Sequence, residues 1–374
     1  MPYKQLGVIS APDGLFSLVE TLQKLGFEVK AISTTHTETA IRVASDLNVQ
    51  CVASTPDELL LRKDVDMIIV TCRPASQAHV VMKSLGIGKH VFCSTPSTVT
   101  LNEAKKLLQS AEYYPQILSL SAFMLRRLEV FCVMQREIAS GYIGDIRSCH
   151  VSVHSPRLHS DRYDWLWDSV TGGGVLNLLG SHYIDLLRFV TKLKARRAIG
   201  MLETQNRGPI NDFRRFEADD FSSFWLKMES NVTAIFSLSA VNSIAHQYEH
   251  EVRVTGSLGT LITRNFELFG EKDGQTELLC ADETLDQDQD SLPTLFFPYS
   301  QLAVFRFGFY KLLETLAGAM QHYDHGLELS GNSWKQFVPH LAKVASFDDN
   351  LYVQHVISAI RKASSSNKWS SVGS

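Results

Sequence analysis

Residues 65–93 read Val-Asp-Met-Ile-Ile-Val-Thr-Cys-Arg-Pro-Ala-Ser-Gln-Ala-His-Val-Val-Met-Lys-Ser-Leu-Gly-Ile-Gly-Lys-His-Val-Phe-Cys, and this stretch decides the fold. Val65–Cys72 is apolar enough for a strand that is covered on both faces, as strands of parallel sheets are. Gln77–Leu85 is predicted to be a helix, and Gly88–Cys93 leads into another strand. A strand, a helix and a strand in succession indicate a parallel pair with a crossover helix.

The same alternation extends back to the start of the chain. Lys4–Ser10 and Phe27–Ser33 are predicted strands, and the helix expected at Leu15–Leu25 between them carries apolar residues at helical spacing. Thr37–Asn48 is expected to form the next helix. The fold class is therefore α/β, with an N-terminal Rossmann doubly wound parallel sheet. Ligands of such sheets bind at the carboxyl ends of the strands, near the switch point.

After about residue 120 the pattern changes to runs of strands joined by short turns. These strands are expected at Phe221–Met228, Val232–Leu238, His250–Thr255 and Gly259–Arg264. They predict a C-terminal α+β domain with an open, largely antiparallel sheet. The predicted division is residues 1–120 for the Rossmann-type domain, 121–363 for the α+β domain and 364–374 for a flexible tail.

Composition excludes several classes of function. Charged residues make up 20% of the 374 residues and the net charge is −4, so neither nucleic acid nor an anionic membrane is an expected partner. No uninterrupted apolar run reaches the roughly 18 residues that span a bilayer. The N-terminus lacks the long apolar core of a signal peptide, so we expect a cytoplasmic location; secretion is the unsupported alternative.

Cysteines and histidines show no pattern typical of a metal site. The six cysteines are scattered without a Cys-x-x-Cys pair, which favours reduced, mostly buried thiols over a disulfide framework. His246 and His250 lie four residues apart, but in a predicted strand rather than on a zinc-binding helix. We predict no metal. Cys93 is either a reactive thiol or, as we favour, a buried structural one.

Eight short blocks indicate a family. They are Ser84-Leu-Gly-Ile-Gly-Lys-His-Val-Phe-Cys, Tyr113-Tyr-Pro-Gln, Gly141-Tyr-Ile-Gly-Asp, Gly172-Gly-Gly-Val-Leu, Gly180-Ser-His-Tyr-Ile-Asp-Leu-Leu, Ala218-Asp-Asp-Phe, Val254-Thr-Gly-Ser-Leu-Gly and Ser346-Phe-Asp-Asp-Asn-Leu-Tyr. In type and order they resemble the Gfo/Idh/MocA oxidoreductases, and more closely their animal branch, the glucose-fructose oxidoreductase domain-containing proteins. The resemblance runs from near residue 7 to near residue 361. It implies a Rossmann domain, an open C-terminal sheet that often forms subunit contacts, and NAD(P)-linked oxidation of sugars, polyols or related compounds.

The glycine fingerprint that binds a dinucleotide is degenerate. The pattern Gly-x-Gly-x-x-Gly/Ala supplies a tight turn, close approach to the pyrophosphate and close helix packing. Here the family's glycine positions hold Ser10 and Pro12, the small third position holds Leu15, and Gly14 is present but displaced. Proline supplies no N–H, and leucine would crowd the helix against the strand. We predict impaired or absent dinucleotide binding; the alternative is a remodelled loop that binds cofactor weakly.

The end of the second strand supports neither dinucleotide strongly. Ser33-Thr-Thr-His carries no acidic residue for the ribose of NAD and no arginine for the 2′-phosphate of NADP. The resemblance therefore names NAD or NADP as the cofactor, and the alternative is that the chain holds none.

Most of the catalytic set implied by the resemblance is replaced. The family's Glu-Lys-Pro is Ser94-Thr-Pro, so Thr95 stands at the position of the lysine that assists proton transfer. A threonine hydroxyl has no useful pKa near neutrality and cannot do this work. Leu178 stands at the family's aspartate position, with Asn177 beside it, and His182 is retained. His182 is the candidate catalytic residue, although a lone histidine on an apolar helix is more often structural.

In the family, the segment that leads to the Gly172 cluster borders the substrate pocket. Trp165 lies on this segment, so Trp165, Asn177 and Leu178 are candidates for the pocket wall. An aromatic wall suits stacking on a sugar or a ring, and packing in the core is equally consistent with the sequence.

Two functions remain open. The leading hypothesis is a catalytically impaired pseudo-oxidoreductase with a binding, scaffolding or regulatory role, acting on a small-molecule ligand in the Rossmann cleft or on a protein partner. A homo-oligomer through the C-terminal sheet is expected. The alternative is an active NAD(P)-dependent oxidoreductase with a divergent site, acting on a sugar, polyol or related small molecule through His182.

Overall fold

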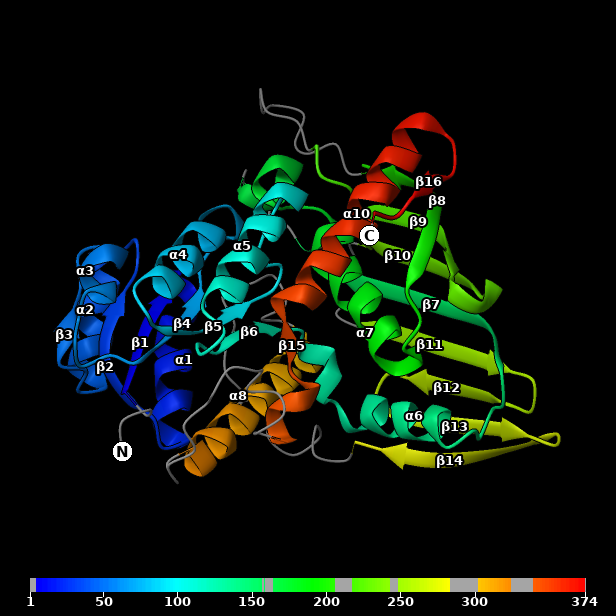
Figure 1. The fold of residues 1–374 in the computed structure, drawn as a ribbon, viewed down its shortest axis with the longest axis horizontal. Coiled ribbons are helices and arrows are strands. Elements are labelled where there is room, and N and C mark those ends of the chain that lie inside the picture. Colours follow the sequence, from blue (N-terminus) through cyan, green and yellow to red (C-terminus); the bar gives the residue numbers. More distant parts are fainter. Residues whose placement is uncertain are drawn as a thin grey trace. The chain divides into compact units, whose positions relative to one another are not determined.

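The chain folds into two compact units, and neither is a continuous segment (Figure 1). The computed structural model describes residues 5–156, 158, 164–205, 217–242, 248–282, 302–323 and 339–373. The first unit comprises residues 1–127 and 288–351, and the second comprises residues 128–287 and 352–374. The predicted division into three consecutive segments therefore differs from the structure, because a late part of the chain returns to the first unit.

The first unit contains a seven-stranded sheet in the order β3-β2-β1-β4-β5-β6-β15. Its strands are β1 (Gln5–Ser10), β2 (Glu28–Ser33), β3 (Cys51–Val52), β4 (Met67–Thr71), β5 (His90–Ser94), β6 (Ser119–Ala122) and β15 (Ala345–Ser346). All neighbours are parallel except β15, which runs antiparallel to β6. The predicted doubly wound sheet is confirmed, and its switch point lies between β1 and β4.

Helices connect the parallel strands. They are α1 (Pro12–Lys24), α2 (Thr37–Asp46), α3 (Pro56–Leu60), α4 (Pro74–Gly86) and α5 (Leu101–Tyr113). The first unit also contains α8 (Ala303–Tyr323) and the short 3-10 helices Met124–Arg127 and Pro339–Lys343. The first helix begins earlier than the predicted Leu15, because Pro12 stands at a position where its fixed φ favours helix and its missing N–H costs nothing. Within the described parts of the chain, no helix combines the length and apolar content that crossing a bilayer requires.

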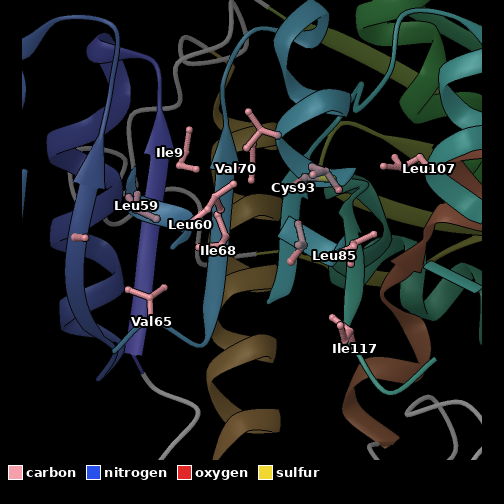
Figure 2. Packing of buried hydrophobic residues seen from close by; sticks show 14 of the residues in the cluster. Ile9, Leu59, Leu60, Val65, Ile68, Val70, Leu85, Cys93, Leu107 and Ile117 are labelled. Carbon is pink, nitrogen blue, oxygen red and sulfur yellow. The ribbon is translucent and has the colours of Figure 1, made fainter. Parts of the chain in front are cut away.

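Figure 2 shows a cluster of buried hydrophobic residues on the face of this sheet that α3, α4 and α5 cover. The alternate residues Met67 and Ile69 of β4 are buried as well, so both faces are covered, as expected for parallel strands. Ile68 and Val70 of β4 are buried together with Leu59 of α3. The approach of α3 is close: a Cβ added to Gly7 on β1 would lie 2.4 Å from Cδ2 of Leu59. A glycine is therefore required in the middle of β1, for packing rather than for backbone conformation.

The second unit contains a nine-stranded sheet in the order β14-β13-β12-β11-β7-β10-β9-β8-β16. The strands are β7 (Ile146–Pro156), β8 (Ala195–Glu203), β9 (Phe221–Met228), β10 (Thr233–Asn242), β11 (Glu249–Gly256), β12 (Thr260–Arg264), β13 (Glu267–Lys272), β14 (Gln275–Ala281) and β16 (Ser370–Ser371). Only β7 and β10 pair in parallel; the other neighbours are antiparallel. The predicted largely antiparallel sheet is confirmed.

Helices α6 (Glu129–Ala139) and α7 (Ser181–Thr191) lie against one face of this sheet (Figure 1). Side chains of β9 alternate accordingly: Phe224 and Leu226 are buried, whereas Trp225 between them is 50% exposed. The other face of the strand therefore remains open, as expected for an antiparallel sheet covered on one side.

The end of the chain differs from the flexible tail that the sequence predicts. Helix α10 (Phe347–Ser366) continues to Ser366, and Ser370–Ser371 then forms β16, which pairs with β8. The N–H of Val372 also donates to the carbonyl of Arg196, at 2.9 Å. The last residues thus cover backbone groups of β8 that would otherwise form an open sheet edge.

Candidate functional site

The carboxyl ends of β1 and β4 are joined to each other at the switch point of the first unit. The hydroxyl of Thr71 donates to the hydroxyl of Ser10 at 2.8 Å, and the N–H of Ala11 donates to the carbonyl of Thr71 at 3.3 Å. Ser10, Ala11 and Thr71 are all buried. The place where a doubly wound sheet admits its ligand is therefore bridged by the protein's own polar groups.

Helix α1 follows β1 with Ala11 as the single residue between them. A helix start leaves backbone N–H groups that can bind phosphate, but here that of Ala11 is already donated and Pro12 has none. Those of Asp13 and Gly14 remain, and Asp13 places a carboxylate at the same end of the helix. Gly14 lies within the first helical turn, so it does not create the separate loop that a displaced glycine could allow.

Leu15 occupies the space that the fingerprint keeps small. Its side chain is 0% exposed and belongs to the buried face of α1. The leucine predicted to crowd the helix against the strand is therefore accommodated as part of the buried core. With Pro12 and Asp13 at the helix start, the residues of this segment do not fit a pyrophosphate in the manner of the Gly-x-Gly-x-x-Gly turn.

Ser33 ends β2 and pairs in register with Ile9 of β1. It is 1% exposed, so its hydroxyl lies within the unit rather than at a surface that a ribose could reach directly. The following Thr34 has a buried Oγ1 without a hydrogen-bond partner in the described parts of the chain.

Thr95 follows β5, and its side chain is committed to the fold. Its Oγ1 donates to the carbonyl of Ala122 at the end of β6, at 2.7 Å, and the residue is fully buried. The preceding Ser94 donates its hydroxyl to Oε1 of Gln77, whose Nε2 donates back to the Ser94 carbonyl. The position that holds a catalytic lysine in the family is therefore part of a buried network that ties β5, β6 and α4 together.

The neighbouring Cys93 is a buried thiol rather than a reactive one. Its Sγ lies 3.5 Å from the carbonyl of Leu120, and burial raises the pKa of the thiol to about 12. Thiolate is the nucleophilic form, so this sulfur is inert near neutrality.

The glycine-rich turn of the second unit is held by Asp219. Its Oδ2 accepts from the N–H of Leu176 and its carbonyl accepts from that of Val175, both at 2.7 Å. Gly174 has a φ of +100°, and a Cβ there would lie 2.3 Å from Oδ1 of Asp219. Burial raises the pKa of Asp219 to about 6. The hydrogen bond from the Leu176 N–H and the charge of Arg361 act in the opposite direction, because both stabilise the carboxylate.

Asn177 and Leu178 lie in a π-helical turn, Leu176–Gly180, that leads into α7. Such turns occur frequently at functional sites. Leu178 lines a small pocket of about 10 Å³, close to the volume that one water occupies. Asp219 and Thr204 line the same pocket. An apolar side chain thus stands where the family has its aspartate.

Asn177 is 1% exposed and its two amide atoms differ in their surroundings. Its Nδ2 donates to the carbonyl of Gly173 at 3.2 Å, whereas its Oδ1 has no hydrogen-bond partner among the described residues. A buried acceptor without a partner costs free energy, and a water or ligand that donated to this oxygen would offset that cost.

His182 lies one turn further along, on α7, and is 1% exposed. Burial lowers the pKa of its imidazole to about 3, so the ring is neutral near neutrality. A neutral ring can donate one hydrogen bond and accept another, but it cannot act as an acid in the way that an imidazolium can. His182 and Asn177 belong to the second unit, whereas Thr95 and Ser10 belong to the first.

The two tryptophans before the glycine-rich turn have different roles. Trp167 is fully buried and packs in the core, whereas Trp165 is half-buried. The carbonyl of Trp165 accepts from the hydroxyl of Thr171 at 2.8 Å, which fixes the short 3-10 helix Trp165–Trp167. Of the two rings, that of Trp165 is the one with surface left to meet a ligand.

Reasoning from the sequence missed three residues that shape these positions. Thr71 ends β4 and Gln77 lies in the following helix α4, near the carboxyl end of the strand where ligand-binding residues of parallel sheets are found. Asp219 stands in the block Ala218-Asp-Asp-Phe, which carried part of the resemblance but no assigned role. Thr71 and Gln77 could have been found from their position at or after the end of a strand. Asp219 could have been found because it belongs to one of the family's blocks.

Comparison with known proteins agrees with this geometry. Residues 7–121 match the family described as oxidoreductases with an NAD-binding Rossmann fold, and residues 131–262 match the GFO/IDH/MocA C-terminal domain. Glucose-fructose oxidoreductase domain-containing protein 1 of Xenopus tropicalis is 31% identical over 359 residues, which cover 95% of this chain and 89% of that protein.

Two solved structures share the fold over nearly their whole length. Levoglucosan dehydrogenase in complex with NADH and L-sorbose has a TM-score of 0.78 at 17% identity, covering 100% of both chains. A super-repressor mutant of Gal80p from Saccharomyces cerevisiae has a TM-score of 0.80 at 15% identity, covering 100% of this chain and 98% of that one. The folds of the two units, their order and these sequence matches together show that the chain belongs to the Gfo/Idh/MocA oxidoreductase family.

Proposed function

We propose that this protein is a catalytically impaired member of its family, with a binding, scaffolding or regulatory role. The observation that carries the proposal is the bridged switch point, where Thr71 donates to Ser10 and α1 begins at Pro12. Reopening this site for a pyrophosphate requires breaking a buried hydrogen bond and displacing the packed Leu15. Each of these costs free energy that cofactor binding would have to supply.

The catalytic positions support the same proposal. Thr95 has its hydroxyl committed to Ala122, and Leu178 supplies no carboxylate. Loss of one general acid or base costs about 10²–10⁴ in rate. With two such groups replaced, hydride transfer by the family's usual route is expected to be very slow.

The test is titration of the purified protein with NADH and with NADPH, followed by calorimetry and by quenching of tryptophan fluorescence. No binding at millimolar cofactor supports the proposal, and micromolar affinity overturns it. A matched variant with Ser10→Gly, Pro12→Gly and Leu15→Ala restores small residues at the three fingerprint positions. A gain of cofactor affinity in this variant would identify the loop as the cause.

The second candidate is an active NAD(P)-dependent oxidoreductase with a divergent site. The unpartnered Oδ1 of Asn177, one turn before the neutral His182, favours it, because both groups suit hydrogen bonds to hydroxyls of a sugar or polyol. The levoglucosan dehydrogenase neighbour was solved with NADH and L-sorbose. Turnover of a polyol with NAD(P), abolished by His182→Ala, would establish this function instead.

The open face of the C-terminal sheet supports a homo-oligomer. Ile199 on β8, Trp225 on β9 and Ile235 on β10 lie opposite one another in register, so their side chains share one face. Met201 on the same face of β8 is 46% exposed. A second copy of the chain is the occupant we propose for this face, since a partly exposed apolar row on a sheet is typical of an interface.

A regulatory role through a protein partner has one further argument. Gal80p, which shares this fold, was solved as a super-repressor mutant, so the fold occurs in a protein whose mutant is named for repression. The likeness extends to the fold alone, and it identifies neither a partner nor a surface for one.

A further inference from the structure

Two of the six cysteines lie on elements of the second unit that pack against each other. Cys132 lies on α6, and Cys280 lies on β14 at the edge of the nine-stranded sheet (Figure 1). Both are half-buried, whereas Cys93 and Cys149 are buried. Cys132 and Cys280 are far apart in the sequence, and the elements that carry them pack together at the sheet edge.

One hydrogen bond sets the register of the helix against the strand. The N–H of Glu129, at the start of α6, donates to Oδ2 of Asp282, directly after β14, at 3.2 Å. Cys132 lies three residues further along the helix, on the same face and about 4.5 Å along its axis. Cys280 lies two residues back along the strand, about 6.6 Å away. Both cysteines therefore lie within about two turns of helix or strand from this hydrogen bond, on elements that pack against each other.

The pairing of β14 shows which way Cys280 points. Cys280 lies opposite Leu268 of β13, and Leu268 is fully buried on the face of the sheet that α6 covers. Paired residues point to the same face, so Cys280 faces α6. Leu278, two residues earlier, follows a register shift; it pairs with Phe269 and is 54% exposed.

The groups that act electrostatically on Cys280 include three residues of α6. The pKa of Cys280 is raised by burial and then by Glu129, Asp282 and Cys132, and Arg136 acts in the opposite direction. Glu129, Cys132 and Arg136 recur at three and four residues and so form one stripe of α6. The electrostatic neighbours and the register thus identify the same surface of the helix.

We propose that Cys132 and Cys280 form a redox-active pair that closes to an intramolecular disulfide when a peroxide oxidises it. The thiolate of one cysteine attacks the peroxide, which gives a sulfenic acid and releases water or hydroxide. The other thiol attacks this sulfur and releases a second water, so that two electrons pass from the two sulfurs to the peroxide. The product is a covalent link between α6 and the edge strand β14.

Two neighbouring carboxylates influence the rate of disulfide formation, and the position of the bond determines its effect on stability. Glu129 and Asp282 oppose formation of the thiolate, so closure is slow near neutrality and accelerates as the pH rises. The bond would close a long loop of the chain and hold the last strand of the sheet, which restricts the unfolded state. It would leave the buried thiols of Cys93 and Cys149 unchanged.

The experiment uses the full-length protein, treated with hydrogen peroxide or with reductant, then alkylated, digested and mapped by mass spectrometry. The expected result is a peptide pair linked through Cys132 and Cys280 that disappears on reduction, together with a higher Tm for the oxidised protein. Cys280→Ser should abolish both changes. Cys51→Ser, at a half-buried cysteine of the first unit, should leave both unchanged.

The opposite outcome is equally defined. Oxidation that yields only sulfinic acid at these positions, or disulfide-linked dimers on a non-reducing gel, would overturn the proposal. The peptide map of the wild-type protein decides the question even if a cysteine variant fails to fold.

Discussion

The hydroxyl of Thr71 donates a hydrogen bond of 2.8 Å to the hydroxyl of Ser10, and this contact joins the carboxyl ends of β4 and β1. In a doubly wound sheet the connections that follow these two strands leave towards opposite faces, and the ligand binds in the crevice outside the strand ends. Here the same place carries a buried polar contact that is satisfied within the protein. Ser10, which stands at a position where the family binds its cofactor, here stabilises the contact between two strands.

This relationship predicts the effect of Thr71→Val. The variant keeps the shape of the side chain but removes the donor, which leaves the Ser10 hydroxyl without that partner. We expect a loss of about 1–3 kcal/mol in the free energy of unfolding, measured by urea denaturation. Ser10→Ala in the same background should recover part of the loss, because it removes the acceptor oxygen that has lost its donor; the recovery is partial, since the donation of that hydroxyl to the Ala11 carbonyl at 3.0 Å is lost too. A double variant less stable than Thr71→Val would contradict this account.

Leu15 predicts a stability cost for restoring the fingerprint. Leu15→Ala makes the third fingerprint position small, but it also empties a fully buried site on α1. We expect a destabilisation of about 2–5 kcal/mol by chemical denaturation. Phe16→Ala in the same helix is the matched control, since Phe16 is 43% exposed and should cost far less. Equal losses in the two variants would show that Leu15 is not part of the core.

Gly174 predicts a local steric effect. Gly174→Ala would force a side chain into a backbone with φ of +100° and against the carboxylate of Asp219. We expect a destabilisation of more than about 2 kcal/mol, read as a lower Tm. Gly86→Ala at the end of α4 is the control, because nothing lies within 4 Å of a Cβ there. Its effect should lie between neutral and a gain of about 1 kcal/mol.

His250 predicts that the second unit loses stability in acid. Its imidazole is buried among the rings of Phe131, Tyr183 and Tyr248, at centroid distances of 5.8, 5.9 and 5.7 Å. Neither ring nitrogen has a hydrogen-bond partner among the described residues, and burial lowers the pKa of the imidazole to about 4. The unfolded chain takes up this proton below pH 6.5, whereas the folded chain resists it.

The His250 contribution to stability is therefore complete above pH 6.5 and is lost as the pH falls towards 4, by about 3 kcal/mol in total. His182 acts in the same direction, whereas Asp219, whose pKa is raised to about 6, favours the folded state at lower pH. Comparison of wild type with His250→Phe isolates the one contribution. A variant whose Tm falls as steeply as that of wild type between pH 6.5 and 4 would refute this assignment.

Trp225 predicts the oligomeric state. Trp225→Glu places a carboxylate between Ile199 and Ile235, in the middle of the apolar row on the open face of the sheet. If a second copy covers this face, light scattering coupled to size exclusion should show a shift from oligomer to monomer. The exposed Tyr113 lies in the other unit, and Tyr113→Glu should leave the mass unchanged. A monomeric wild-type protein would rule out this interface.

Much of the architecture could be predicted because local pattern and fold agree. The strand Phe221–Met228 alternates buried and open positions, and its predicted bounds are those of β9. The edge strand β14 was not predicted; its side chains are mostly exposed, so it lacks the alternation that marks a half-buried strand. The pairing of β16 with β8 depends on residues far apart in the chain, and no local pattern signals it.

The sequence by itself determined the family, the two kinds of sheet and the identity of the altered residues, because periodicity, composition and short motifs are local properties of the chain. Only the tertiary structure decided what those residues do. The commitment of the Thr95 hydroxyl to Ala122, the Thr71–Ser10 contact and the Asp219 clasp on the glycine-rich turn each join segments distant in sequence. Their free energies depend on burial and on the geometry of partners, which packing alone creates.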